Sequence, residues 1–255
     1  TLVLSGNNTN SGSTKINSGT LRISSANNIG SIPGSFDSDK LIFNDGTLNI
    51  TSSITLDSNS GVSYTGANAN FDVNSGTTLT INGIVSGSGS AMTKLGSGNL
   101  TLSGVNTYTA STTINAGTIS IIADSGLGAA PGSASAGHLT LNGGTLESTA
   151  DFTLNSNRGI ALGASNGIID INSGTTLTYG GIMAGSGTLT KEDSGTLTLS
   201  GVNTYSGSTT INDGTVSISA DSGLGAAPGS ATAGHLTLNG GTLHSSADFT
   251  MNANR

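Results

Sequence analysis

A long internal repeat dominates this chain of 255 residues. Residues 99–158 align with residues 196–255 at an offset of 97, and only 11 of the 60 compared positions differ. The first part of the chain carries a weaker copy at an offset of 98, which aligns Gly6 with Gly104. Because near-identical copies extend one architecture, we expect a continuous array and interpret the chain as an excerpt of a longer one. The expected units are residues 1–98, 99–195 and, as a partial copy, 196–255.

A shorter pattern is nested inside the long repeat: an apolar residue, Asn, any residue, Gly and Thr. After Asn115 the next four corners fall at Asn142, Asn172, Asp193 and Asn212, with Asp193 as a degenerate copy. Spacings of roughly 20 to 30 residues are typical of solenoids, in which each coil buries its apolar face only by stacking on a neighbour. The pattern therefore predicts about four coils per long repeat. Its eight Asn residues are Asn17, Asn44, Asn74, Asn115, Asn142, Asn172, Asn212 and Asn239.

Short bursts of alternating apolar and polar residues indicate the local structure. Alternation with period two, bounded by Gly, Asn and Ser, is a strand signal, and no stretch has a helical pattern. The chain is therefore predicted to be an all-β, parallel β-helix. Thr140 should face outward, and the neighbouring residues that should face the core are Leu139, Leu141, Phe152, Leu154, Ile169 and Ile171.

The main alternative fold is a string of immunoglobulin-like sandwiches, because the length of the repeat is close to the usual ~100-residue size of such a domain. A sandwich needs two packed sheets and gives no reason for the same corner to return four times per domain. The chain also lacks Trp and has five Phe. The β-helix is favoured.

The repeated Asn residues are expected to have a structural role. Asn tolerates left-handed backbone and bonds its own main chain at turns. When coils stack at the ~4.8 Å strand spacing, equivalent Asn side chains can bond along the axis as a ladder. We therefore interpret the eight Asn as a corner ladder rather than as ligand-binding residues.

The charge composition excludes several function classes. Charged residues make up 8% of the chain and the net charge is −7, with the seven cations scattered. Nucleic acid is not an expected partner, because phosphate binding needs clustered cations. The chain has no Cys, hence no disulfide or thiol chemistry, and no segment expected to insert into a membrane. No cofactor is expected.

A repeated Asp-Ser-Gly motif and three histidines could carry chemistry, and each has a simpler explanation. Asp-Ser-Gly occurs at Asp124, Asp193 and Asp221, and its return at corners favours turns over a protease nucleophile. His138 and His235 are equivalent, stand where the first copy has Lys40, and are expected on the surface, as is His244, aligned with Glu147 and Asn49. None of them has zinc-ligand spacing, and the calcium-binding nonapeptide is absent. We expect no metal site and no catalytic residue.

Two alternative functions remain beside a structural role. A β-helical enzyme acting on polysaccharides needs facing carboxylates, for which the equivalent Asp72 and Asp170 are candidates, yet an active site is normally built once. An ice-binding solenoid would use outward Thr-x-Thr rows, such as Thr78 to Thr80, Thr176 to Thr178 and Thr196 to Thr198. Unequal coil lengths should break such a flat face, so ordinary β-propensity is preferred for Thr.

A family resemblance rests on one run of residues in the last two copies. This run is Gly185-Ser-Gly-Thr-Leu-Thr-Lys191, then Ser194-Gly-Thr-Leu-Thr-Leu-Ser-Gly-Val-Asn-Thr-Tyr-Ser-Gly207 and Thr209-Thr-Ile-Asn-Asp-Gly-Thr215. It resembles the autotransporter-associated β-strand repeat of bacterial passenger domains and covers about a third of each long repeat. The middle copy has Thr109-Ala110 in place of Ser-Gly, and the first copy departs further with Asn10 in place of Tyr. The resemblance implies a right-handed parallel β-helix outside a Gram-negative cell.

The sequence is therefore interpreted as a non-enzymatic structural and adhesive cell-surface protein, a repetitive β-helical stalk. Its expected partners are like chains, or a surface, host or matrix ligand.

Overall fold

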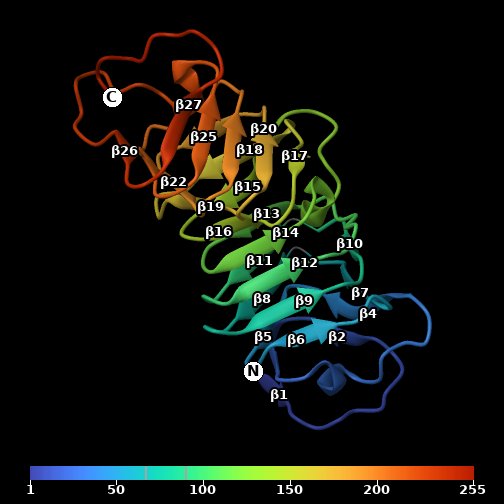
Figure 1. Cartoon of the computed structure of the whole chain (residues 1–255). Coiled ribbons are helices and arrows are strands. Elements are labelled where there is room, and N and C mark those ends of the chain that lie inside the picture. Colours follow the sequence, from blue (N-terminus) through green and yellow to red (C-terminus); the bar gives the residue numbers. More distant parts are fainter. Residues whose placement is uncertain (67, 90) are drawn as a thin grey trace. The chain divides into compact units, whose positions relative to one another are not determined.

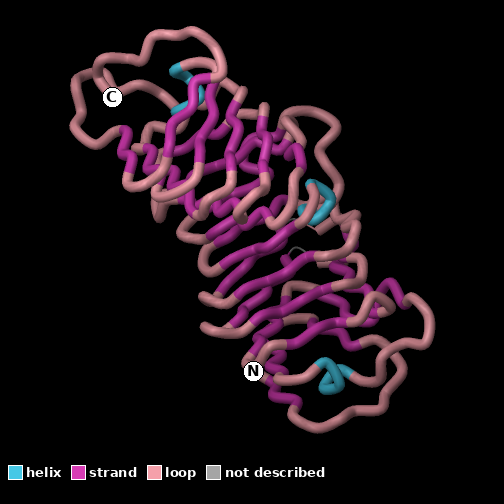
Figure 2. The backbone as a smooth tube through the Cα atoms, viewed as in Figure 1, coloured by secondary structure: helices cyan, strands magenta, loops and turns pink. Residues whose placement is uncertain are grey.

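The computed structural model describes residues 1–66, 68–89 and 91–255, and its chain divides into two units. Unit 1 comprises residues 1–121 and 125–129, and unit 2 comprises residues 122–124 and 130–255. Strands form nearly all the regular structure of the described residues, and the three short 3-10 helices stand out in Figure 2. Among the described residues, no helix has the length and apolar character needed to cross a membrane.

The strands of unit 1 line three faces. The first face contains β1 (Leu2–Leu4), β3 (Gly19–Ile23), β5 (Gly46–Ile50), β8 (Asn68–Val73), β11 (Ala91–Leu95) and β13 (Ser111–Ile114). The second contains β6 (Ile54–Leu56), β9 (Thr78–Ile81), β12 (Asn99–Leu102) and β14 (Thr118–Ile121). The third contains β2 (Thr14–Ile16), β4 (Asp37–Phe43), β7 (Ser60–Tyr64) and β10 (Val85–Gly87). Helix η1 (Ala26–Ile29) follows β3.

The strands of unit 2 also line three faces, which we call the alanine, carboxylate and threonine faces. The alanine face contains β15 (Ser135–Leu141), β18 (Arg158–Leu162) and β21 (Met183–Gly185). The carboxylate face contains β16 (Thr145–Ser148), β19 (Gly167–Ile171), β22 (Leu189–Glu192), β24 (Thr209–Ile211) and β26 (Leu236–Leu238). The threonine face contains β17 (Phe152–Leu154), β20 (Thr176–Tyr179), β23 (Thr196–Leu199), β25 (Thr215–Ile218) and β27 (Thr242–Ser245). Helices η2 (Asp124–Leu127) and η3 (Asp221–Leu224) follow β14 and β25.

Each unit is a parallel β-solenoid. Neighbouring strands on a face are parallel and come from successive coils, as in the pairs β9 with β12 and β25 with β27, which Figure 1 shows side by side. The predicted all-β parallel β-helix is confirmed, and the immunoglobulin-like alternative, which requires antiparallel sheets, is wrong. The right hand of the helix stays a prediction from the family resemblance.

The long repeat contains a fraction of a coil beyond four. Strands β16 and β27 are equivalent in the repeat, yet β16 lies on the carboxylate face and β27 on the threonine face. From β16 to β27 the chain takes thirteen steps from one face to the next, two of which cross the alanine side without forming a strand. At three steps per coil, this is four coils and one further face. The same holds in unit 1, where the equivalent strands β2 and β13 also lie on different faces. About four coils per repeat is thus confirmed, with one face added.

Alternation along the strands fills the core as predicted. In unit 2 five of the six residues expected inside are at most 1% exposed, while Thr140 is half-buried on the outside. Phe152 is the exception, since its ring is only half-buried. It begins β17, the edge strand of the threonine face, so no strand of that sheet covers it on one side.

Glycine is required at the corners because two coils approach closely there. Gly117 and Gly214 have φ values of +63° and +64° and occupy the Gly position of the Asn-x-Gly-Thr pattern. A Cβ on either would lie 2.3 Å from the carbonyl oxygen of Gly98 or Gly195 in the preceding coil. Both the left-handed backbone and the contact therefore exclude a side chain.

All four tyrosines of the chain are buried, which gives a first prediction. Burial raises the pKa of Tyr179 and of Tyr205 to about 12, and it also raises that of Tyr64. At about pH 11, one unit above the ordinary tyrosine pKa of ~10, the native protein should show little tyrosinate absorbance and the urea-unfolded chain nearly all of it. Since the folded state holds these protons more tightly, stability is complete below pH ~10 and is lost as pH rises through the folded values. A native titration with its midpoint near ~10 would contradict the buried placement.

Candidate adhesive faces

The outward positions of unit 2 give each face a different chemistry. Along each strand the buried residues, most of them apolar, alternate with residues that point outward, so columns of outward side chains run across the stacked strands of each of the three faces. The threonine face presents hydroxyl groups, the carboxylate face is acidic and the alanine face is apolar.

The threonine face carries two columns of hydroxyl groups. Registered pairs place Thr176 beside Thr196 and Thr178 beside Thr198 on neighbouring strands. The hydroxyl groups of these residues form no hydrogen bond to any other described residue. The full columns are Thr176, Thr196, Thr215 and Thr242, and Thr153, Thr178, Thr198 and Ser217.

Unequal coils do not disturb this face, contrary to our expectation. On each strand one inward residue lies between the two outward threonine positions. These inward residues are unequally spaced along the chain, and yet the two columns stay in register. These partners are Leu177, Leu197, Val216 and Leu243. The extra residues of the longest coil lie between β25 and β26, outside the sheet. Variable coil length therefore does not break the regular Thr surface, and our expectation that it would was wrong.

The carboxylate face stacks three acidic residues on consecutive strands. Registered pairs place Glu147 beside Asp170, and Asp170 beside Glu192. Partial burial, followed by the nearby charge of Glu147, raises the pKa of Asp170. The amide of Asn212 donates to Glu192 at 2.6 Å. No group of three or more His, Cys, Asp or Glu within the described part of the chain is arranged to hold a metal ion.

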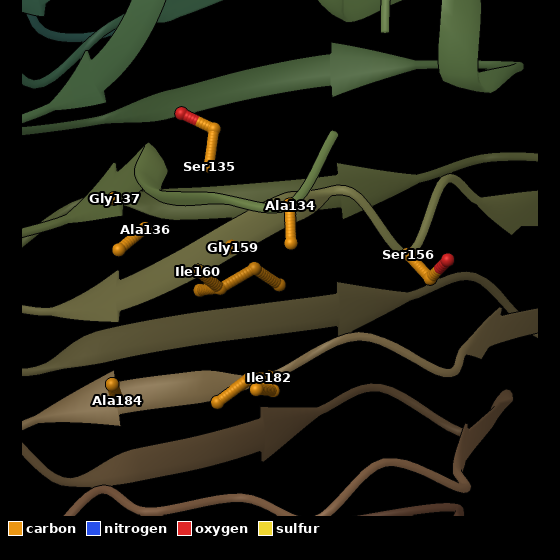
Figure 3. Close-up of a pocket in the computed structure, with 9 residues that line it drawn as sticks. All are labelled: Ala134, Ser135, Ala136, Gly137, Ser156, Gly159, Ile160, Ile182 and Ala184. Atoms are coloured by element: carbon orange, nitrogen blue, oxygen red, sulfur yellow. The ribbon is translucent and has the colours of Figure 1, made fainter. Parts of the chain in front are cut away.

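The alanine face contains a shallow apolar hollow of about 190 Å³ (Figure 3). Its rim includes Ala134, Ala136 and Ala184, together with Ile182, whose side chain is 51% exposed. In the first copy of the repeat the position of Ala134 is held by Phe36, which is 48% exposed. At this one position of the rim, unit 2 therefore has a small side chain where the first copy has a large one.

The carboxylate candidates for an enzyme lie in different surroundings. In unit 1, Asp72 accepts a hydrogen bond from Asn49 at 2.9 Å, and Arg22 donates to the same Asn49 at 2.8 Å. In unit 2 the column around Asp170 contains Glu147 and no arginine. The two sites therefore differ in charge although they share a place in the repeat.

The eight corner Asn residues do not share one corner. In unit 1, Asn17 and Asn44 follow strands of the third face, whereas Asn74 and Asn115 follow strands of the first. In unit 2, Asn142 follows a strand of the alanine face, and the other three, Asn172, Asn212 and Asn239, follow strands of the carboxylate face. The prediction of one ladder through all eight is wrong, because each long repeat advances by four coils and one face.

Two pairs of these Asn residues do contact each other through their side chains. Asn239 donates to Asn212 at 3.2 Å, and Asn44 donates to Asn17 at 3.5 Å. Each pair is separated by 27 residues, one complete coil. Short ladders at single corners therefore remain our proposal for these residues.

The histidine expectation was wrong for two of three residues. His138 and His235 are only 8% and 6% exposed, and the equivalent Lys40 is 1% exposed. The amine of Lys40 donates to the backbone oxygen of Gly12 at 3.0 Å, so a polar group is tolerated inside this position. His244 is exposed as expected, and its Nδ1 lies 3.1 Å from the hydroxyl of Ser217.

Two of the Asp-Ser-Gly motifs form ion pairs that sequence reasoning missed. Asp124 begins η2 and accepts from Nε of Arg158 at 2.8 Å and from its Nη2 at 3.1 Å. Asp221 begins η3 and is paired in the same way with Arg255, at 2.7 and 3.0 Å. Asp193 instead occupies a corner with φ +58°. Two short helices and a corner are positions that the turn interpretation expects.

These pairs hold a loop onto the next coil. The Arg158 side chain is fully buried and that of Asp124 is 25% exposed. Partial burial alone would raise the pKa of Asp221, but hydrogen bonds from Arg255 and from the backbone of Asn252 lower it overall. Its stabilising contribution is therefore present above the ordinary aspartate pKa of ~3.9 and lost as pH falls through the lowered value.

A second missed residue is the Asn of the Val-Asn-Thr-Tyr run. Asn106, 3% exposed, accepts from the backbone of Val85 at 2.8 Å and donates to the carbonyl of Gly126 at 2.8 Å. Asn203 makes the equivalent bonds in unit 2. This side chain bridges the coil before it to the coil after it where no strand does so. The signal for it was its recurrence at Asn8, Asn106 and Asn203.

Comparison with known proteins agrees with this architecture. The family model of the passenger-associated-transport-repeat matches residues 1–23, 92–121 and 189–218. The chain is 38% identical over 224 residues to "Adhesin BmaC autotransporter" of Brucella suis biovar 1 (strain 1330), an alignment that covers 83% of this chain and 6% of that protein. No solved structure matches the chain. The chain thus contains three passenger-associated-transport-repeats and is a homologue of one short segment of an autotransporter adhesin.

Proposed function

We propose that this chain is a repeat segment of a non-enzymatic adhesin passenger displayed outside a Gram-negative cell. The observation that carries the proposal is the parallel solenoid of near-duplicate repeats, whose homologue is a named adhesin. Such a solenoid adds length with each repeat and presents the same outward side chains again and again. Both properties suit a protein that must reach and hold a distant surface.

The distribution of aromatic residues supports a non-enzymatic role. Sugar-processing sites combine facing carboxylates with exposed aromatic rings. Six of the nine Phe and Tyr rings are at most 1% exposed, those of Phe43, Phe71, Tyr64, Tyr108, Tyr179 and Tyr205. Of the other three, Phe152 and Phe249 are half-buried and Phe36, in unit 1, is 48% exposed. The carboxylate column of Glu147, Asp170 and Glu192 therefore has none of the six buried rings available to stack a sugar.

The repeats can act as a stalk that carries a binding tip or as an adhesive wall. Since residues 196–255 nearly duplicate residues 99–158, deleting residues 99–195 joins sequences that already follow each other elsewhere in the chain. Chains with one, two or three repeats, displayed on cells, should then differ in reach and in number of outward faces. An adhesive wall predicts attachment that rises steeply with repeat number, because identical sites act multivalently.

Attachment to matrix-coated surfaces measures this, with an unrelated rigid linker restoring the lost length as the control. We expect the linker to restore only part of the attachment. Full recovery with one repeat and the linker would eliminate the adhesive wall and leave the stalk. Absence of attachment with any number of repeats would contradict an adhesive role for the segment.

A further inference from the structure

The threonine face is the surface of unit 2 best suited to close approach by another protein surface. The chain carries a net charge of −7, and the neighbouring carboxylate face concentrates three acidic residues in one column. The two columns of hydroxyl residues contain no Asp, Glu, Lys or Arg. His244 extends the second column at one edge of the face, and at the other edge the exposed carboxylate of Asp151 accepts from the backbone N–H of Thr176 at 2.6 Å. Charge repulsion between two acidic chains is therefore weakest here.

The chemistry of this face is shared by both copies of the repeat. In unit 1 the equivalent outward positions lie on β6, β9, β12 and β14, and six of seven keep a hydroxyl group. The other faces change: Glu147 and Glu192 correspond to Asn49 and Leu95, and Ala134 corresponds to Phe36. The seven pairs are Thr153 and Thr55, Thr176 and Thr78, Thr178 and Thr80, Thr196 and Asn99, Thr198 and Thr101, Thr215 and Thr118, and Ser217 and Ser120.

We propose that the threonine face binds the threonine face of a second copy of this chain. Hydroxyl groups both donate and accept hydrogen bonds, so two such columns satisfy each other. A second copy also repeats its columns at the same ~4.8 Å strand spacing, which makes the two surfaces commensurate over any length. The inference rests on the proposed display of many copies outside the cell, where like chains meet at high density.

The size of the face determines how the contact should behave. Five strands at ~4.8 Å and three residues at ~3.3 Å give roughly 240 Å² per chain. Two faces would bury about 480 Å² in total, well below the ~1,200 Å² of a specific stable complex. A single pair of units should thus associate weakly, and dense arrays should associate strongly through many weak contacts. The free chain should remain monomeric at micromolar concentration.

Charge exchange on beads tests the proposal. The full chain is coupled at high density to beads, as wild type, as Thr178→Lys/Thr198→Lys and as Thr178→Glu/Thr198→Glu. Wild-type beads should clump. Each variant alone should clump clearly less than wild type, because like charges then face each other in unit 2 while the equivalent face of unit 1 is unaltered. Mixing Lys beads with Glu beads should restore the clumping. A structural defect in either variant could not produce that rescue.

The matched control is Thr190→Lys/Thr210→Lys on the carboxylate face. These two residues are also registered neighbours, half-buried and outward, so they create the same cross-strand lysine pair. We expect this control to clump like wild type. Equal loss in the control, unchanged clumping of the Thr178/Thr198 variants, or failure of the mixed beads to clump would overturn the proposal. If circular dichroism shows that the double variants are unfolded, the single variants Thr198→Lys and Thr198→Glu repeat the charge exchange at one position. The expected results and the results that would overturn the proposal are the same.

This test contains no host or matrix surface. It can therefore fail while attachment to a foreign surface persists, and succeed while such attachment is absent. The outcomes for self-association and for the proposed adhesin role are thereby separate.

Discussion

Replacing Asp124 with alanine is expected to lower the free energy of unfolding by about 3–5 kcal/mol, because it removes the carboxylate that balances the charge of a buried guanidinium. The Arg158 side chain is fully buried and its Nε and Nη2 both donate to this carboxylate. The change also removes the acceptor for the backbone N–H of Asn155, at 2.9 Å. Urea unfolding followed by circular dichroism measures the loss.

The first copy of the repeat supplies the control for this experiment. Its residues at the two equivalent positions are Ala26 and Ser60, so both charges are absent together. The double variant Asp124→Ala/Arg158→Ser recreates that combination and should lose clearly less than the single variant, since no charge is left buried. A single variant within about 0.5 kcal/mol of wild type, the range of ordinary surface substitutions, would show that the pair does not hold the loop. A double variant as unstable as the single one would place the cost in lost packing instead.

The fold was predictable because its two signals are local and periodic. Alternation places Leu139 and Leu141 inside, and the recurring corners reveal stacked coils. The exact number of coils per repeat was not predictable by the same reasoning. The corner pattern predicts one coil between Asn142 and Asn172, whereas the chain there passes through one coil and one further face, because strands on different faces share the same local pattern.

The ion pairs were missed for a different physical reason. Asp124 and Arg158 are 34 residues apart and lie on no common strand, so neither alternation nor motif spacing connects them. A solenoid brings residues one coil or more apart into contact, and only its register says which. The available signal was covariation among the copies, since both residues recur at Asp221 and Arg255 and both are replaced in the first copy.

The threonine face illustrates what a correct fold leaves open. Thr at alternate positions is explained by β-propensity alone, and the sequence does not say which coils share a sheet. Only the registered pairs, such as Thr178 with Thr198, show that the hydroxyl groups form continuous columns. The surface therefore depends on the lateral order of strands, which is a property of the whole coil.

Replacing Leu141 with asparagine should lower the free energy of unfolding of unit 2 by several kcal/mol, through two costs that add. Leu141 is fully buried at the end of β15 and is registered with Leu162 of the next coil. Loss of the apolar side chain alone costs about 2–5 kcal/mol, and the buried amide without partners adds about 1–3 kcal/mol. Because each coil is stabilised by its neighbours, the damage should spread to adjacent coils.

The neighbouring Thr140 is the matched control for this last change. It lies half-buried on the outer side of the same strand, so Thr140→Ser should alter the free energy of unfolding by about 0.5 kcal/mol or less. Hydrogen exchange should show the difference by location as well as size. In Leu141→Asn the amides of β15 and its partner β18 should lose protection first, while Thr140→Ser should leave them unchanged. Equal sensitivity at the two positions would mean that the alternation does not define the inside of the coil. Protection lost evenly along unit 2 would mean that its coils unfold as one cooperative block rather than outward from the damaged coil.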